Sequence, residues 1–134
     1  AAALDRTVSL YLKEDIRKEI PVYEMMSRSA KQLEEMAKEL EKEAGCLTDK
    51  KLIFETVPTS NVAGGGTTPG KPMAGFALRI KACDGSMSAE EISHRLRCLA
   101  TPVISHIQDD WVYLEMRTLL PGDLEILKKE LKDL

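Results

Sequence analysis

The sequence is poor in the residue types that build metal centres and disulfide frameworks. It has 134 residues, among them two histidines and three cysteines. Cys46, Cys83 and Cys98 are scattered, with no CxxC spacing and no paired histidines near them. An odd number of separated cysteines is typical of free thiols in a reducing compartment. We therefore expect no metal site and a cytoplasmic location.

The chain also lacks long hydrophobic runs and an excess of basic residues. No apolar stretch approaches the roughly 20 residues needed to span a bilayer, and no series typical of a signal peptide opens the chain. The formal net charge of -3 gives no broad electrostatic surface for nucleic acid. We expect no membrane partner, and we expect that this domain alone does not bind RNA. The length and the 43% hydrophobic content suit one core, which predicts a single domain over residues 1–134.

Recognisable catalytic motifs are absent as well. There is no Ser-His-Asp set at a familiar spacing and no Walker loop, and residues 64–68 do not match the glycine pattern that opens a helix after a strand. His94 falls in a predicted helix beside Arg95, and His106 falls in a predicted strand. We interpret both histidines as structural or solvent-facing side chains rather than as bases.

What the sequence does contain is a glycine-rich stretch at residues 61–72, Asn-Val-Ala-Gly-Gly-Gly-Thr-Thr-Pro-Gly-Lys-Pro. Glycine loses the most backbone entropy on ordering and proline lacks an amide donor, so this stretch cannot be a helix or an ordinary strand interior. It predicts a shaped loop that is long for a compact domain. Two interpretations stay open: a surface connector, or a functional loop whose glycines let the backbone approach another molecule.

Two helical patterns precede this loop. The first begins at the start of the chain without a capping residue, so we expect the chain to be cut from a longer polypeptide. We place this entering helix at residues 1–19, because the residue before Pro21 is pushed out of the helical region. The second helix starts with a capping box formed by Ser29 and Gln32, and its apolar stripe is closed by Gly45.

Strand patterns flank the glycine-rich stretch and recur near the C-terminus. Residues 52–57 are rich in apolar and β-branched side chains, and residues 76–81 alternate apolar with polar or small ones. Residues 103–107 and 111–117 are two further strand patterns separated by three polar residues, which predicts a hairpin.

Two more helices complete the pattern. Ser88 and Glu91 form a second capping box, which opens a helix that ends before Pro102. A closing helix follows Pro121, with lysines in its last turn. The sequence therefore predicts an α+β fold: a small, largely antiparallel four-stranded sheet with helices packed on one face.

Arg117 is the most interesting charged residue. In a strand over residues 111–117 it would lie on the face opposite Val112, Leu114 and Met116. A guanidinium at a strand end can bind a carboxylate or a phosphate through two parallel hydrogen bonds. The alternative is an ion pair with an acidic group of another domain, and the residues themselves leave both open.

Several segments, taken in order, resemble one known family. The glycine-rich run 63–70 and the Arg-Thr-Leu-Leu-Pro run 117–121 are the most specific of them. The matching segments are 20–22, 29–37, 63–70, 88–91, 96–97, 102–104 and 114–121. Together they resemble the C-terminal domain of bacterial selenocysteine synthases, the L-seryl-tRNA(Sec) selenium transferases.

The resemblance implies the small domain of a fold-type-I pyridoxal-phosphate enzyme. Such an enzyme converts seryl-tRNA(Sec) to selenocysteinyl-tRNA(Sec) with selenophosphate, and its large domain carries the lysine that binds the cofactor. The partners implied are this large domain, the two substrates and further copies of the enzyme in a decameric ring built from dimers. No lysine of the chain stands in the family's cofactor-binding setting. We therefore expect no catalytic residue and no bound cofactor in this chain, and no activity from it alone.

By the same resemblance, the substrate-binding candidates are Gly64, Gly65, Gly66 and Thr67 at the mouth of the active site, together with Arg117. The sequence departs from the family pattern at Ser105-His106 and at residues 73–75. These departures keep two alternatives open. One is a paralogous pyridoxal-phosphate ammonia lyase that acts on a small amino acid or amino sugar acid, and the other is a non-catalytic oligomerisation module.

Overall fold

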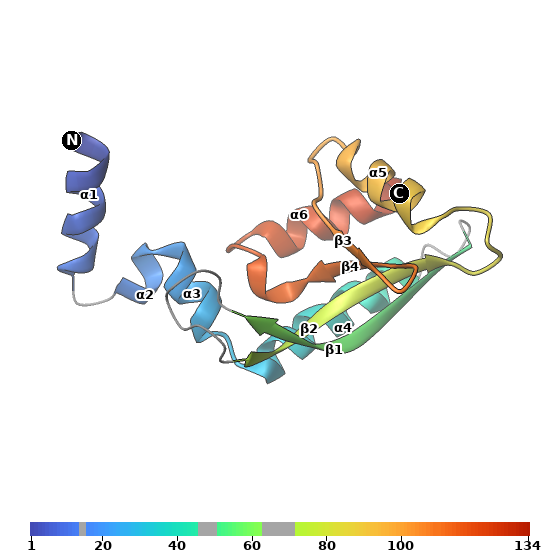
Figure 1. Ribbon diagram of the computed structural model, residues 1–134, viewed down its shortest axis with the longest axis horizontal. Coiled ribbons are helices and arrows are strands. Elements are labelled where there is room, and N and C mark those ends of the chain that lie inside the picture. The colour runs from blue at the N-terminus through green and yellow to red at the C-terminus, as the bar shows by residue number, and fades with distance from the viewer. Residues whose placement is uncertain (14–15, 46–50, 63–71) are drawn as a thin grey trace.

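The computed structural model describes residues 1–13, 16–45, 51–62 and 72–134. A sheet and three covering helices form the body, and an arm of short helices extends from it to the N-terminus (Figure 1). No helix among the described residues is long and apolar enough to cross a membrane.

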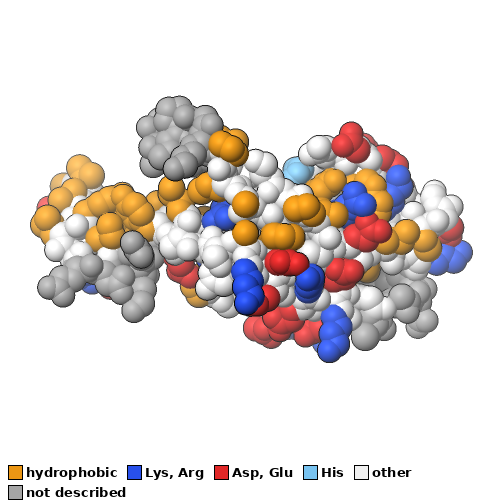
Figure 2. Space-filling view, turned by 90° about the horizontal axis from the view of Figure 1, so that it is seen from below, with side chains coloured by type: hydrophobic (Ala, Val, Ile, Leu, Met, Phe, Trp, Pro, Cys, Tyr) orange, Lys and Arg blue, Asp and Glu red, His pale blue; other side chains and the backbone are white. Residues whose placement is uncertain are grey.

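The N-terminal arm consists of three short helices: α1 (Ala2–Tyr11), α2 (Ile16–Glu19) and α3 (Pro21–Ser27). The predicted helix over residues 1–19 is therefore two helices in the structure. Ile20 is extended, as expected before a proline, and Pro21 then occupies the first turn of α3, where its missing amide is not needed. Helix α1 buries none of its residues, and Leu4 is 69% exposed. Hydrophobic side chains consequently gather on the surface of this arm (Figure 2).

The sheet has the order β1-β2-β4-β3, and every neighbouring pair is antiparallel. This confirms the predicted antiparallel four-stranded sheet. Its two long strands, β1 (Leu52–Val62) and β2 (Pro72–Ala82), form one hairpin. The shorter strands β3 (His106–Gln108) and β4 (Trp111–Glu115) form the second.

The first hairpin is longer than the sequence predicts. Strand β1 runs to Val62 rather than to residue 57, so the outer residues of the stretch 61–72 belong to strands. Pro58 does not interrupt β1, because β1 is an edge strand and can leave a residue without an amide donor. Residues 63–71 lie outside the described part of the chain.

The second hairpin is shorter than predicted. The amide of Val103 donates to the carbonyl of Leu96 at 2.9 Å, which ties this residue to the preceding helix, and β3 begins only at His106. Strand β4 ends at Glu115 and passes into a single 3-10 turn, η2 (Met116–Thr118). The prediction of a strand reaching Arg117 is therefore wrong.

Three helices cover one face of the sheet. Helices α4 (Ala30–Gly45) and α5 (Ala89–Arg97) begin with the predicted capping boxes. Helix α6 (Asp123–Glu130) continues into the 3-10 turn η3 (Leu131–Asp133). Alternate strand residues and the apolar helix stripes form one core. Its fully buried large side chains are Leu33, Leu40, Leu78, Ile80, Ile92, Leu96, Val112 and Met116.

Candidate functional site

Arg117 lies inside the body rather than on the open face of the sheet, where the sequence placed it. Only 7% of the residue is exposed. Nη1 donates to the carbonyl oxygens of Met25 at 2.9 Å and Arg28 at 3.1 Å, and Nη2 donates to that of Ala74 at 2.7 Å. The guanidinium therefore joins α3, the α3–α4 link and strand β2. Its Nε has no hydrogen-bond partner among the described residues.

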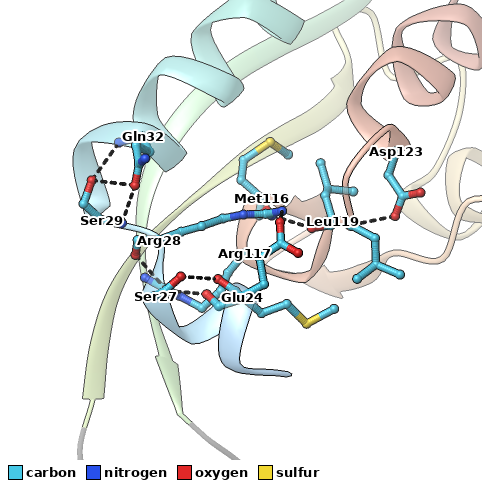
Figure 3. A network of polar contacts seen from close by, with 11 residues as sticks. Glu24, Ser27, Arg28, Ser29, Gln32, Met116, Arg117, Leu119 and Asp123 are labelled. Carbon is cyan, nitrogen blue, oxygen red and sulfur yellow. Dashed lines mark hydrogen bonds and ion pairs between the residues drawn. The ribbon is translucent and has the colours of Figure 1, made fainter. Parts of the chain in front are cut away.

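A second arginine approaches the same place from the opposite direction. Arg28 follows α3, and its Nη1 donates to the carbonyls of Met116, at 3.5 Å, and Leu119 on either side of Arg117 (Figure 3). Its other terminal nitrogen pairs with the Glu24 carboxylate at 3.3 Å. The α3–α4 link and the turn η2 are thus held together by two guanidinium groups.

Burial changes the pKa of Arg117. Loss of solvent lowers the pKa of Arg117, and the neighbouring charge of Arg28 lowers it further, while Glu115 acts in the opposite direction. The ordinary pKa of arginine is so high that Arg117 keeps its charge near neutral pH. The carbonyl dipoles of Met25, Arg28 and Ala74 take the place of water around this charge.

On the open face of the sheet, Glu115 forms a second polar cluster. Its Oε2 accepts one hydrogen bond from Thr59 Oγ1 and one from Asn61 Nδ2, both at 3.0 Å. Thr59 and Asn61 belong to β1, whereas Glu115 belongs to β4, so both side chains reach across β2. Gly75 makes this crossing possible, because a Cβ at that position would lie 2.1 Å from Asn61 Oδ1 and 3.0 Å from Thr59 Oγ1.

A shallow hollow of about 640 Å³ lies over this open face. Beyond the Glu115 cluster, Arg79 binds the Glu55 carboxylate, and its guanidinium carbon lies 4.1 Å from the centre of the Trp111 ring. The hydrogen bond to Glu55 is the main cause that raises the pKa of Arg79.

His106 stacks on Tyr113 with ring centres 5.1 Å apart. His106, which was predicted to be a structural or solvent-facing side chain, is exposed and packs its ring against Tyr113.

A more apolar cavity of about 360 Å³ lies on the other side of β4, between the segment after α5 and helix α6. Pro102, Ile104, Leu119 and Ile126 contribute to its wall. Arg117, the predicted substrate-binding residue that the structure describes, does not line this cavity. The described residues also contain no group of histidine, cysteine or carboxylate side chains able to hold a metal ion.

Comparison with known proteins places these features in a family. The family model described as L-seryl-tRNA selenium transferase matches residues 1–120. The chain belongs to this family. Among similar curated proteins, the L-seryl-tRNA(Sec) selenium transferase of Moorella thermoacetica is 33% identical over 131 residues, 97% of this chain and 27% of the relative. That of Clostridium perfringens is 32% identical over 135 residues, 99% of this chain and 28% of the relative.

The enzyme of the same name from Aquifex aeolicus is 29% identical over 133 residues, which again cover 99% of this chain and 28% of the relative. The chain therefore spans little more than a quarter of the length of the selenium transferases it matches. The similarity to these enzymes confirms the resemblance that the ordered segments predicted. The matched stretches cover 97–99% of the chain.

Three described lysines of this family member are held as charged ammonium groups, whereas a covalent link to pyridoxal phosphate requires a neutral amine. Hydrogen bonds to Glu125 and Glu39 raise the pKa of the buried Lys128 and hold it protonated. Lys38 and Lys51 are exposed and form ion pairs with Glu34 and Asp84. Lys38, Lys51 and Lys128 therefore do not suit that link.

Of the predicted substrate-binding residues, the structure describes Arg117. Gly64, Gly65, Gly66 and Thr67 lie outside the described residues. Sequence reasoning missed the roles of Arg28 and Glu115. One signal was available for Glu115, since a glycine within a strand pattern, here Gly75, is typical of close approach by a neighbouring group.

Proposed function

We propose that this chain is the C-terminal domain of an enzyme that converts seryl-tRNA(Sec) to selenocysteinyl-tRNA(Sec), with selenophosphate as the selenium donor and pyridoxal phosphate as the cofactor. The observation that carries this proposal is the similarity to enzymes of that name along 97–99% of the chain. In this proposal the lysine that binds the cofactor belongs to a large domain outside the chain, and the ion pairs of Lys38, Lys51 and Lys128 support this assignment.

The test is a selenium-transfer assay with the full-length protein that contains this chain. Purified protein is incubated with pyridoxal phosphate, seryl-tRNA(Sec) and selenophosphate, and the aminoacyl group on the tRNA is identified. We expect selenocysteinyl-tRNA(Sec), and none when selenophosphate is omitted. Conversion of a free amino acid or amino sugar acid, with seryl-tRNA(Sec) left unchanged, would favour the ammonia-lyase alternative and contradict the proposal.

We further propose that the chain alone is catalytically silent. Titration of the isolated chain with pyridoxal phosphate is expected to produce no saturable change in visible absorbance beyond that of the free cofactor. A saturable change that disappears when one lysine is substituted would place the cofactor site in this chain and overturn this part of the proposal.

Within the enzyme, Gly64, Gly65, Gly66 and Thr67 are proposed to line the mouth of the active site. Glycine backbone amides can bind an anionic group, and the absence of side chains leaves room for the aminoacyl end of a tRNA. Direct contact of Arg117 with substrate stays a prediction. Nη1 already donates to the carbonyls of Met25 and Arg28 and Nη2 to that of Ala74, whereas Nε has no hydrogen-bond partner among the described residues and is the donor left for such a contact.

We also propose that the exposed apolar residues of the arm contact the large domain or another subunit of a ring-shaped homo-oligomer. Leu4, Val8 and Leu12 are 69%, 51% and 83% exposed, and α1 has no buried residue. Such surface is costly in water. We expect Leu4→Glu and Val8→Glu together to shift the full-length protein to smaller species in light scattering if the arm contacts another subunit, whereas an unchanged mass would contradict that contact and leave the large domain as the partner.

A further inference from the structure

The β1–β2 hairpin continues beyond the point where the sheet loses its third strand. The β2–β4 ladder runs from Ile80↔Val112 to Ala77↔Glu115, while the β1–β2 ladder goes on to Val62↔Pro72. Residues 58–62 and 72–76 therefore form a hairpin overhang with no β4 backbone beside it. An isolated two-stranded hairpin is marginally stable in water, so this overhang needs support from elsewhere.

Glu115, the last residue of β4, supports the β1 half of the overhang. Its carboxylate accepts hydrogen bonds from Thr59 and Asn61, two successive residues on the open face of β1. Hydrogen bonds to an ionised group are stronger than those between neutral groups. The contact passes over Gly75, where any side chain would meet Asn61.

Arg117 supports the β2 half of the overhang. A continued β4 would pair backbone with backbone here, but the chain turns into η2 and the guanidinium donates to the carbonyl of Ala74 instead. In the register, Ala74 pairs with Ser60, which lies between Thr59 and Asn61. Glu115 and Arg117, two positions apart in sequence, thus bind β1 and β2 at neighbouring positions along the hairpin.

The same guanidinium connects the overhang to the N-terminal arm. Arg117 donates to the carbonyls of Met25 and Arg28, and Arg28 donates back to Met116 and Leu119. These bonds join α3 and the α3–α4 link to the hairpin end of the body.

We propose that Glu115 and Arg117 are positioning residues that replace the missing strand beside the hairpin overhang and thereby fix the two chain ends from which residues 63–71 depart. This inference rests on the proposed function in one respect, namely that residues 64–67 serve the selenium-transfer reaction. Neither Glu115 nor Arg117 touches substrate in this assignment. Their effect on the reaction passes through Thr59, Asn61 and Ala74.

The first test is independent of activity. Hydrogen exchange of the full-length protein, followed by mass spectrometry of its peptides, is compared for the wild type, Glu115→Ala and Arg117→Lys. We expect amides of residues 59–62 and 73–76 to exchange about tenfold faster in both variants, which corresponds to the loss of charge-assisted hydrogen bonds. Amides of residues 77–80, which keep the β4 ladder, are expected to be unchanged.

Two further variants make this test specific. Glu115→Gln keeps the shape and one acceptor oxygen, so it should restore much of the protection lost in Glu115→Ala. Glu55→Gln is the matched control, because Glu55 also binds a side chain on the open face but lies within the four-stranded part of the sheet. Protection of the overhang that is unchanged in Glu115→Ala and Arg117→Lys would overturn the proposal.

The second test measures the rate of selenocysteinyl-tRNA(Sec) formation. We expect Glu115→Ala and Arg117→Lys to lower kcat at least about fivefold at a temperature well below the thermal midpoint of each variant, with Glu115→Gln closer to the wild type and Glu55→Gln equal to it. Arg117→Lys separates positioning from anion binding, since lysine keeps the charge but lacks the planar, branched set of donors that joins carbonyls of three segments. Faster exchange with an unchanged rate would overturn the catalytic part, whereas a wild-type enzyme without selenium transfer would contradict the proposed function and leave the exchange result standing.

Discussion

Arg28 and Arg117 each donate hydrogen bonds to the backbone of the segment that carries the other. Arg117 Nη1 lies 3.1 Å from the Arg28 carbonyl oxygen, and Arg28 Nη1 lies 3.5 Å from that of Met116, the residue before Arg117. Two like charges repel, but here carbonyl oxygens and the Glu24 carboxylate surround them. A link between segments 89 residues apart therefore depends on two side chains.

Arg117→Ala should be among the more destabilising single substitutions in the chain. It leaves the carbonyls of Met25, Arg28 and Ala74 without a donor that is itself only 7% exposed. We expect a loss of about 3 kcal/mol in the free energy of unfolding, measured with urea. Arg95→Ala on the exposed side of α5 is the control, with a change within about 0.5 kcal/mol. A loss at Arg117 no larger than at Arg95 would contradict the role of the guanidinium.

Two glycines should respond in opposite directions to alanine. In Gly75→Ala the new Cβ would lie 2.1 Å from Asn61 Oδ1, so Asn61 must move and its bond to Glu115 is lost. We expect a loss of about 1–2 kcal/mol. In Gly45→Ala the Cβ meets nothing within 4 Å, and alanine favours the helix, so stability should rise by up to about 1 kcal/mol. Equal effects in thermal unfolding would count against the crossing over β2.

The capping box of α5 should contribute measurably to stability. Ser88 Oγ accepts from the amide of Glu91 at 3.2 Å, and the Glu91 carboxylate accepts from the amide of Ser88 at 2.8 Å. Ser88→Ala removes the first bond and is expected to cost about 1 kcal/mol. Ser88→Asp keeps a capping oxygen and should recover most of this loss. If alanine and aspartate give the same urea midpoint, the cap does not stabilise the helix.

Stability should fall in alkaline solution because of Lys128. Hydrogen bonds to Glu125 and then Glu39 raise the pKa of Lys128 above its unfolded value. The stabilisation is therefore fully present below the unfolded pKa of about 10.4, and it is lost as the pH rises through the higher folded value. Urea unfolding of the wild type and Lys128→Met across this range should give curves that converge as the pH rises. A constant difference between the two curves would show that the ammonium charge is not the cause.

Much of the fold was predictable because its signals are local. Each capping box lies within four residues and predicted its helix start, Ser29 for α4 and Ser88 for α5. The strand ends were less predictable, since they depend on neighbours distant in sequence. Strand β1 passes Pro58 only because it is an edge strand, and β4 ends before Arg117 because Arg117 bonds to Met25, Arg28 and Ala74.

The candidate site likewise combines features that local sequence patterns predict with contacts that depend on residues distant in sequence. Arg117 was recognisable as unusual, yet its burial was not, because no pattern within residues 111–117 encodes contacts to α3 and β2. Glu115 lies on the open face of the sheet, as alternation along residues 111–115 dictates. Its two partners on β1 depend on the register of the first hairpin and on the space over Gly75.

The amino-acid sequence by itself determined the fold class, the starts of α4 and α5, the core stripes and the family, because these follow from local spacing and from ordered short segments. The tertiary structure alone decided that Glu115 and Arg117 hold opposite strands of one hairpin. The physical reason is that a charged side chain acquires its role from the donors and carbonyls that the fold brings within hydrogen-bond distance, and here those groups come from segments more than 40 residues away.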